Sequence, residues 1–276
     1  MDISFTKMHG LGNDFMVIDA TSQKLKLSSQ KIRQLSDRHL GVGFDQLLVV
    51  ETSTHEDIDF HYKIYNADGN EVSQCGNGAR CFARFVRDKG LINKDIISVM
   101  TNSGKITLYL EDKNMIRVNM GIPDFDPKTI PFQAKCRSSS YNLDIDKKTI
   151  NVCAVSIGNP HAVIIVEDID QAPVQTLGPR IGALADFPEG VNVGFMQILN
   201  SSEIILRVFE RGSGETQACG SGACAAVACG KSLGKLDSNV IVHLKGGDLQ
   251  LTWKDESEPV FMTGTATSVY EGQISL

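Results

Sequence analysis

The chain has 276 residues, of which 42% are hydrophobic and 22% are charged, a composition typical of a globular protein with one large or two medium domains. Its formal net charge is −6 and no block of like charges occurs, so we expect neither a nucleic-acid partner nor a membrane partner. No apolar run approaches the roughly 20 residues that a membrane span requires.

The first residues and the cysteines bear on the compartment. The opening MDISFTKMHG lacks the basic and then apolar pattern of a signal peptide. Seven cysteines are an odd number in a chain too large to need disulfide staples, which favours a reducing compartment. No C-x2-C pair, phosphate-binding loop or dinucleotide motif is found. We therefore expect a cytoplasmic protein with no metal and no cofactor.

Strand patterns dominate the first half of the chain. Residues 58–66, IDFHYKIYN, alternate apolar and polar side chains and predict a strand, and ADGN at 67–70 predicts a turn. After Gly76, apolar residues recur at helical spacing as far as Val86, and Gly90 is placed to end this helix. Further strands are predicted at 15–19, 47–50, 96–100, 106–110 and 115–119.

A domain boundary is predicted after Gly121, where prolines at 123, 127 and 131 crowd a stretch unsuited to a helix or a central strand. In the second half, EIILRVF at 203–209 predicts a strand and ERGSGE at 210–215 a turn. Residues 223–228 are so small and apolar that they predict a buried helix.

The two halves repeat each other in order. The matched stretches are 12–18 with 158–164, 42–48 with 193–199, 75–79 with 219–223, and 104–121 with 247–264, at offsets of 146, 151, 144 and 143. Such an order at nearly constant spacing indicates an internal duplication. The fold expected is α+β, with two pseudo-symmetric domains that each surround one helix with strands.

A cysteine opens the same motif in both halves, CGNGA from Cys75 and CGSGA from Cys219. Glycines let a ligand approach the backbone, and the N-terminus of a helix favours a carboxylate and a thiolate. Two such sites suit the removal of a proton from one face of a stereocentre and its return to the other face. The other cysteines are expected to be small core residues, namely Cys81, Cys136, Cys153, Cys224 and Cys229.

The stretches NADGNEVSQCGNGARCFARFV (66–86) and ERGSGETQACGSGACAAV (210–227) closely resemble the two active-site signatures of diaminopimelate epimerases, a family of amino acid epimerases that work without pyridoxal phosphate. The likeness extends from KMHGLGNDF to GTATSVYEG. It implies conversion of LL-diaminopimelate to the meso form for lysine and peptidoglycan synthesis. It also implies curled, mostly antiparallel sheets around central helices, in domains 1–120 with 265–276 and 121–264, and an active site in the cleft between them.

The resemblance also implies roles for individual residues. Cys75 matches the proton donor and Cys219 the proton acceptor, while His161 and Glu210 match residues that tune the cysteines. Ser221 stands where the family usually has threonine, and it keeps the hydroxyl group and the backbone N–H. Tyr270 matches a dimer contact, so a homodimer is expected. The substrate contacts implied are Asn13, Gln46, Asn66, Gly76, Asn77, Asn159, Asn192, Glu210, Arg211, Gly220 and Ser221.

Three other readings stay open at the level of the sequence. A proline or hydroxyproline racemase would use a similar cysteine pair, but it would have no role for Arg211 because its substrate lacks a distal carboxylate. A non-catalytic amino-acid-binding protein would not need both Cys75 and Cys219. A redox sensor would use these two cysteines as a dithiol and would be active as the disulfide.

Overall fold

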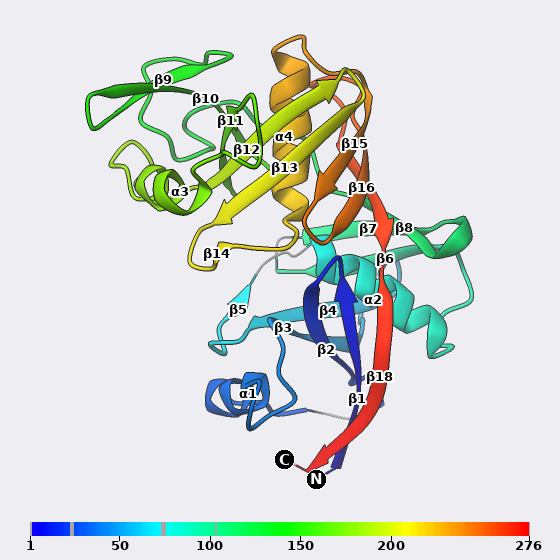
Figure 1. Cartoon of the computed structure of the whole chain (residues 1–276). Helices are drawn as coiled ribbons and strands as arrows, with labels where there is room; N and C mark the ends of the chain where they lie inside the picture. Colours follow the sequence, from blue (N-terminus) through cyan, green and yellow to red (C-terminus); the bar gives the residue numbers. More distant parts are fainter. Residues whose placement is uncertain (1, 23–24, 73–75, 103, 276) are drawn as a thin grey trace. The chain divides into compact units, whose positions relative to one another are not determined.

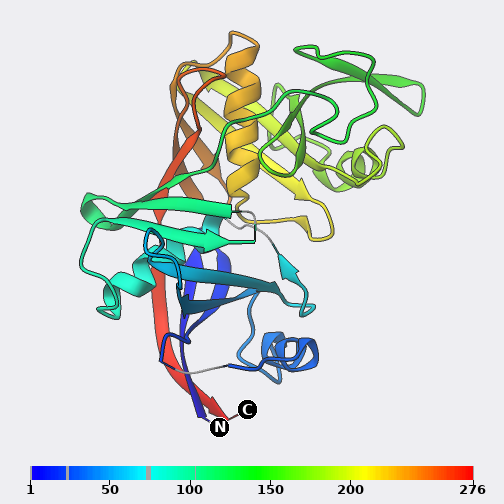
Figure 2. The ribbon, with the colours of Figure 1, turned by 180° about the vertical axis from the view of Figure 1, so that it is seen from behind.

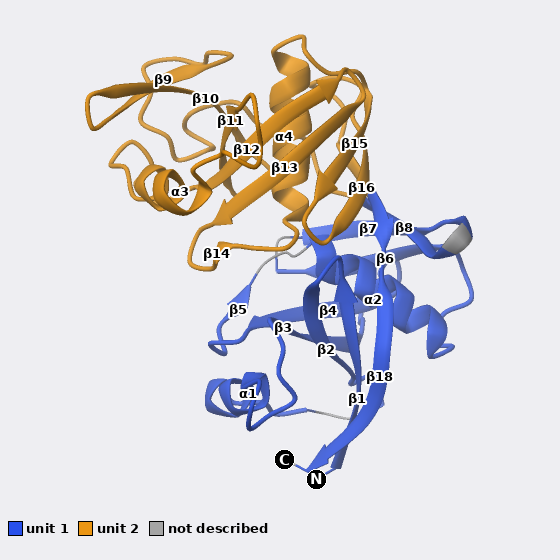
Figure 3. Cartoon of the chain, viewed as in Figure 1, with its two compact units in different colours: residues 1–118, 263–276 blue, residues 119–262 orange. Residues whose placement is uncertain are grey.

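The computed structural model describes residues 2–22, 25–72, 76–102 and 104–275. The chain divides into two compact units (Figure 3), residues 1–118 with 263–276 and residues 119–262. The bounds expected from the sequence lie two residues further along, at 120 and 264. Each unit is a curled, mostly antiparallel sheet with one central helix, so the expected α+β class is confirmed (Figure 1).

Unit 1 is built around the helix α2, which contacts the strands β1, β2, β3, β7 and β18. The described pairs of its sheet are β1–β18 and β1–β2 antiparallel, β2–β3 parallel, β3–β4 and β4–β5 antiparallel, β4–β6 parallel, and β6–β7 and β7–β8 antiparallel. The elements are β1 (Asp2–Gly10), β2 (Asn13–Asp19), α1 (Ser29–Ser36), β3 (Gln46–Thr52), β4 (Phe60–Asn66), β5 (Glu71–Val72), α2 (Gly76–Asp88), β6 (Ile96–Thr101), β7 (Gly104–Leu110), a 3-10 turn (Asp112–Asn114), β8 (Met115–Asn119) and β18 (Thr267–Ser275).

Unit 2 repeats this order around the helix α4, which runs along one face of its sheet (Figure 2). Its described pairs are β9–β10 and β10–β11 antiparallel, β11–β12 parallel, β12–β13 and β13–β14 antiparallel, β13–β15 parallel and β15–β16 antiparallel. The elements are β9 (Tyr141–Ile145), β10 (Lys148–Ser156), β11 (Pro160–Ile165), α3 (Val174–Gly182), β12 (Asn192–Asn200), β13 (Glu203–Glu210), β14 (Gly214–Glu215), α4 (Gly220–Ser232), β15 (Asn239–Leu244), β16 (Gly247–Thr252) and β17 (Phe261–Thr265), which ends in unit 1.

The register of the sheets corrects one match between the halves. Gln46 opens β3 opposite Phe15, and Asn192 opens β12 opposite His161. The offset between Gln46 and Asn192 is therefore 146 (192 − 46), the same as between Asn13 and Asn159. The match of residues 42–48 with 193–199 is wrong, because residues 42–44 precede β3 whereas 193–199 lie within β12. The likeness of the two VGF stretches is coincidental.

The two predicted helices are confirmed, and each has 13 residues. Gly90 follows α2 with a φ of 66°, and its N–H donates to the carbonyl oxygen of Arg87 at 3.0 Å, which is the expected helix stop. Ten residues of α4 are buried, as its small apolar sequence predicts. Residues 120–140, which include the three prolines, form neither a helix nor a strand, as the sequence predicted.

Most of the cysteines expected in the core lie there, and one does not. Cys81, Cys153, Cys224 and Cys229 are buried. Cys136 is exposed, because it lies in the irregular segment that follows the boundary, within residues 135–139, which are all exposed. Across the part of the chain that the structure describes, no helix has the length and apolar character needed to cross a membrane.

Candidate active site

The repeated motif is explained first by packing at its second glycine. A Cβ atom on Gly78 would lie 2.5 Å from the Tyr62 hydroxyl, and one on Gly222 would lie 2.9 Å from Cγ2 of Val208. Carbon atoms in contact normally lie about 3.5–4.0 Å apart, so neither position accommodates a side chain without displacement. Tyr62 and Val208 lie on β4 and β13, the equivalent strands of the two sheets. Each glycine thus allows the first turn of its helix to approach its strand.

Cys219 stands directly before α4, in the N-cap position. Its backbone is extended (φ −120°, ψ 107°), and its carbonyl oxygen accepts the N–H of Ala223 at 2.9 Å. The N–H groups of the first residues of α4, Gly220 among them, therefore have no partner inside the helix, and they form the positive end of its dipole. This end of the helix favours a carboxylate, as the sequence predicted.

The surroundings of Cys219 favour the protonated thiol. Burial raises the pKa of the Cys219 thiol well above its ordinary value, and the negative charge of Glu210 raises it further. The Ser221 hydroxyl, whose Oγ lies 3.6 Å from Sγ, and the Gly222 backbone N–H act in the opposite direction. The resemblance assigned the proton acceptor to Cys219, whereas its environment holds the form that donates a proton.

His161 joins the same cluster from β11. Burial, and then the positive charge of Arg211, lower the pKa of His161 to about 3, so the imidazole is neutral. Its Nε2 lies 3.0 Å from Oδ1 of Asn159 and 3.1 Å from Oγ of Ser221. Because Oδ1 only accepts hydrogen bonds, Nε2 carries the proton. Asn159 Nδ2 in turn donates to Ser221 Oγ at 3.4 Å, which completes a triangle beside Cys219.

The end of β13 brings in the remaining residues predicted in unit 2. The Asn192 side chain accepts the backbone N–H of Arg211 at 2.9 Å and donates to the Pro160 carbonyl oxygen at 3.0 Å. Glu210 accepts the hydroxyl of Thr216 at 2.5 Å. Arg211 is exposed, and its guanidinium donates to the backbone oxygen of Glu189 at 2.5 Å. All the residues predicted in unit 2 thus gather around the N-terminus of α4 and the adjacent strand ends.

In unit 1 the predicted amides form two hydrogen-bonded pairs. Gln46 Nε2 donates to Oδ1 of Asn66 at 2.8 Å, across the β3–β4 pair. Asn77 Nδ2 donates to Oδ1 of Asn13 at 3.3 Å, from α2 to the start of β2. Gln46 Oε1 is buried and finds no hydrogen-bond donor among the described residues.

Two of the predicted residues need separate mention. Cys75 lies outside the described residues, and the next residue, Gly76, is the first of α2. Tyr270 lies on β18 with 47% of its surface exposed, and it packs edge-on against Phe5, with the ring centres 6.0 Å apart. Exposure of this kind suits a contact with another chain.

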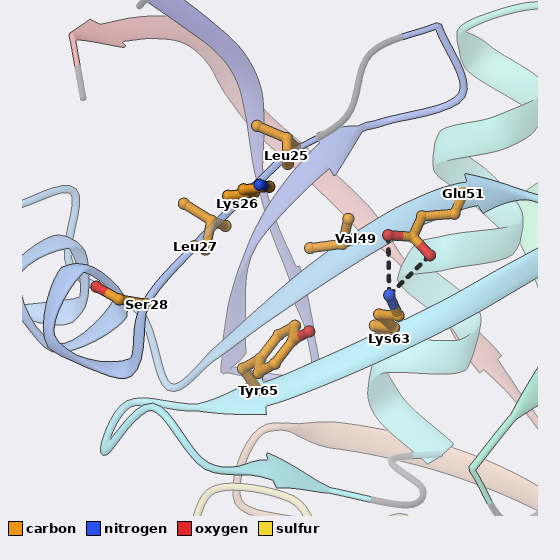
Figure 4. A pocket seen from close by; sticks show the side chains of 8 residues that line it. All are labelled: Leu25, Lys26, Leu27, Ser28, Val49, Glu51, Lys63 and Tyr65. Atoms are coloured by element: carbon orange, nitrogen blue, oxygen red, sulfur yellow. Dashed lines mark hydrogen bonds and ion pairs between the residues drawn. The ribbon is translucent and has the colours of Figure 1, made fainter.

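A pocket of about 420 Å³ lies elsewhere on unit 1 (Figure 4). Leu25, Leu27, Val49 and Tyr65 give it apolar walls. The ion pair of Glu51 and Lys63, 2.9 Å apart, lies on another side. No predicted site residue lines it, so this pocket is separate from the candidate site.

Glu71 and Glu215 share a position four residues before the two cysteines, and the sequence left open whether they form turns or face the helices. Neither Arg207 nor Lys245 was predicted as a supporting residue. Glu215, on β14, is nearly buried and pairs with Arg207 at 2.7 Å and Lys245 at 2.5 Å, so it holds the turn that leads to Cys219. Glu71, its counterpart in the first half, is exposed and accepts a hydrogen bond from Asn102 at 2.8 Å. The shared glutamate position therefore serves different purposes. The charge of Arg207 within the otherwise apolar stretch IILRVF was the one sign in the sequence of a partly buried ion pair there.

The architecture and the cysteine-led helices define a class of duplicated α+β proteins. The chain belongs to the diaminopimelate epimerase family, whose model matches residues 5–125 and 153–269. Membership of this family supports the prediction that the protein is an epimerase or a related isomerase.

Solved structures share the fold at low sequence identity. A phenazine biosynthesis protein of the PhzF family from Bacillus anthracis is 18% identical with a TM-score of 0.71, over 100% of both chains. A hydroxyproline epimerase from Agrobacterium vitis, with bound trans-4-hydroxy-L-proline, is 13% identical with a TM-score of 0.71, over 100% of this chain and 93% of that one. A probable proline racemase from Agrobacterium radiobacter is 15% identical with a TM-score of 0.71, over 99% and 93%. Because the names of these proteins differ, the fold does not select the substrate.

Proposed function

We propose that the protein interconverts LL- and meso-diaminopimelate by transferring protons between the α-carbon and two cysteines, without a cofactor. The observation that carries the proposal is the cluster around Cys219, where a sulfur at a helix N-terminus meets Glu210, Ser221 and His161. The family membership supports the epimerase chemistry, and the residues matched to diaminopimelate contacts support the substrate.

The proposed step balances within the protein and the substrate. The thiolate of one cysteine takes the α-proton and becomes a thiol, while the thiol of the other gives its proton to the opposite face of the carbon and becomes a thiolate. The protonated state favoured at Cys219 suits the direction in which Cys75 removes the proton. In the reverse direction, which the resemblance implies for LL-diaminopimelate, Cys219 first has to lose its proton.

The α-proton beside a carboxylate is far less acidic than a thiol, so the base alone is insufficient. The N–H groups at the start of α4, with the helix dipole, are placed to stabilise the negative charge that develops on the substrate carboxylate. Loss of one such donor typically raises the barrier by about 3–4 kcal/mol. In this proposal Gly220 and Ser221 supply donors in unit 2, and Gly76 and Asn77 supply them in unit 1.

Arg211 is proposed to bind the distal carboxylate. Its planar guanidinium offers paired donors that match a carboxylate, and its exposure keeps it within reach of a ligand. The proximity of Glu210 to the thiol of Cys219 supports a role for that carboxylate in tuning the cysteine. The alternative is a proline or hydroxyproline racemase, because two of the structural neighbours have names of this kind.

The test is α-proton exchange from deuterated water into LL-diaminopimelate. The protein is first dialysed against chelator and treated with hydroxylamine to remove metals and pyridoxal phosphate. Proline and hydroxyproline are assayed in parallel. Exchange with diaminopimelate alone supports the proposal, whereas exchange only with proline or hydroxyproline supports the alternative. A requirement for added pyridoxal phosphate or zinc would contradict the mechanism.

The partner and the compartment remain predictions. Homodimer formation through the face that carries Tyr270 is tested by sedimentation of the wild type and of Tyr270→Ala at equal concentration. A monomeric wild type would contradict it. Fractionation of the cells that make the protein tests the cytoplasmic location.

A further inference from the structure

A buried arginine lies inside unit 1, on the helix α2. The Arg80 side chain is fully buried in α2. Its Nη2 donates to Oδ1 of Asn77 at 3.0 Å, and its Nε donates to the carbonyl oxygen of Thr265 at 3.1 Å. Burying a guanidinium is costly unless it is hydrogen-bonded, so a residue of this kind usually has a specific task.

Arg80 begins a chain of hydrogen bonds that passes through two predicted substrate contacts. Asn77 Nδ2 donates to Asn13 Oδ1 at 3.3 Å, and Asn13 Nδ2 donates to Oδ2 of Asp45 at 3.0 Å. The other oxygen of Asp45 accepts Nη2 of Arg38 at 2.7 Å. The chain therefore runs from one charged group to another across both asparagines.

The two ends of this chain fix its direction. A guanidinium only donates hydrogen bonds and a carboxylate only accepts them. Arg80 therefore turns the Asn77 oxygen toward itself and the Asn77 NH2 group toward Asn13. Asp45 in the same way turns the Asn13 NH2 group toward itself and the Asn13 oxygen toward Asn77. An asparagine without such neighbours exchanges its oxygen and nitrogen positions by a simple rotation.

Gly10 gives this arrangement the space that it needs. A Cβ atom at Gly10 would lie 3.2 Å from Nη2 of Arg80 and 3.2 Å from the backbone oxygen of Asn77. Gly10 lacks the positive φ that would itself require glycine. The glycine at the end of β1 is therefore explained by the side chains beside it.

Unit 2 reaches the same result with different residues. The position equivalent to Phe15 is His161, whose Nε2 donates to Oδ1 of Asn159, the counterpart of Asn13, at 3.0 Å. The position equivalent to Arg80 is Cys224 (80 + 144). In unit 1 the donor to the asparagine oxygen is Asn77 of the helix α2, whereas in unit 2 it is His161 of the strand β11.

From these contacts we infer that Arg80 and Asp45 are positioning residues that hold the amide groups of Asn13 and Asn77 in one orientation for the substrate. The inference rests on the proposed function, because it takes these asparagines as substrate contacts. Neither Arg80 nor Asp45 needs to touch the substrate. Arg80 and Asp45 affect the substrate only through the orientation of the Asn13 and Asn77 side-chain amides.

The test compares Arg80→Gln, Asp45→Asn and the double variant, with Arg84→Gln on the same helix as the control. Arg84 pairs with Asp88 and is not part of the hydrogen-bond chain. Each single variant loses one fixed end, so kcat/KM for α-proton exchange should fall about tenfold, as a hydrogen bond of about 1.4 kcal/mol implies. Because both ends hold the same two amides, the double variant should fall much less than a hundredfold.

Several outcomes separate positioning from simple packing. Arg80→Lys keeps a group that only donates, so it should retain clearly more activity than Arg80→Gln at matched thermal stability. A loss of activity that is multiplicative in the double variant, or equal to that of Arg84→Gln, would overturn the inference while leaving the proposed function intact. If Arg80→Gln fails to fold, Asp45→Asn paired with Gly10→Ala repeats the same comparison.

A readout without substrate keeps the inference testable if the proposed function fails. In 15N-labelled protein, the side-chain NH2 signals of Asn13 and Asn77 should both move in Asp45→Asn, although Asp45 bonds only Asn13 of the two. A change confined to Asn13 would contradict a connected chain. Failure of the wild type to exchange protons in diaminopimelate would instead contradict the proposed function.

Discussion

Substitution of Gly222 by alanine tests how closely α4 approaches β13. The new Cβ would lie 2.9 Å from Cγ2 of Val208, 3.2 Å from Cβ of Cys219 and 3.3 Å from its Sγ. Overpacking of this kind costs about 1–3 kcal/mol, while alanine in a helix returns at most about 1 kcal/mol relative to glycine. Because the contacts are with the branched Val208 and the backbone-proximal atoms of Cys219, we expect a net loss of about 1–2 kcal/mol in the free energy of unfolding.

Gly182→Ala is the matched control, because its Cβ would meet only the Val191 carbonyl oxygen at 3.4 Å. Both glycines lie in helices, so urea denaturation of the two variants separates packing from helix propensity. We also expect Gly222→Ala to lose more activity than Gly182→Ala, since the displaced helix end carries the site. If Gly222→Ala were as stable as Gly182→Ala, the close approach would not be the reason for the glycine.

Substitutions at three further positions test the site and its support. Ser221→Ala should lose about 1 kcal/mol of stability together with most of the exchange activity, whereas Ser221→Thr should keep both, as urea titration and exchange rates will show. Glu210→Asn removes the negative charge near Cys219, so the ionisation of Cys219 in the pH–rate profile should move to lower pH. Hydrogen bonds, that from Arg207 first, lower the pKa of Glu215 from 4.5 to about 2. Its contribution to stability is therefore complete above pH 4.5 and lost as the pH falls toward 2, and Glu215→Gln should flatten the pH dependence of unfolding in that range.

The sequence predicted the architecture well because its signals were local. Alternating apolar residues mark β4, and helical spacing followed by Gly90 marks α2. The order of the motifs revealed the duplication. It could not establish register, since VGF occurs in both halves by chance, and only the pairing of Gln46 with Phe15 and of Asn192 with His161 shows the true equivalence.

The site was predictable where residue type implied chemistry, and less so where packing decided the outcome. Glycines and a cysteine before a helix indicated the candidate site around Cys219. The role of Arg80 could not be predicted, because its partner Thr265 is distant in the sequence and its link to Asp45 passes through the two asparagines. Cys136 was misplaced because a single cysteine in an irregular stretch contains no information about which side chains cover it.

Among the differences between the two halves, one concerns the charge near Cys219. Asn66 is the last residue of β4, and Glu210 is the last residue of β13, its counterpart. The neutral amide adds no charge in the first half, whereas the carboxylate raises the pKa of the Cys219 thiol in the second. This difference puts a negative charge beside Cys219 that Asn66 does not supply in the first half, and in the proposed mechanism it would favour the thiol at Cys219.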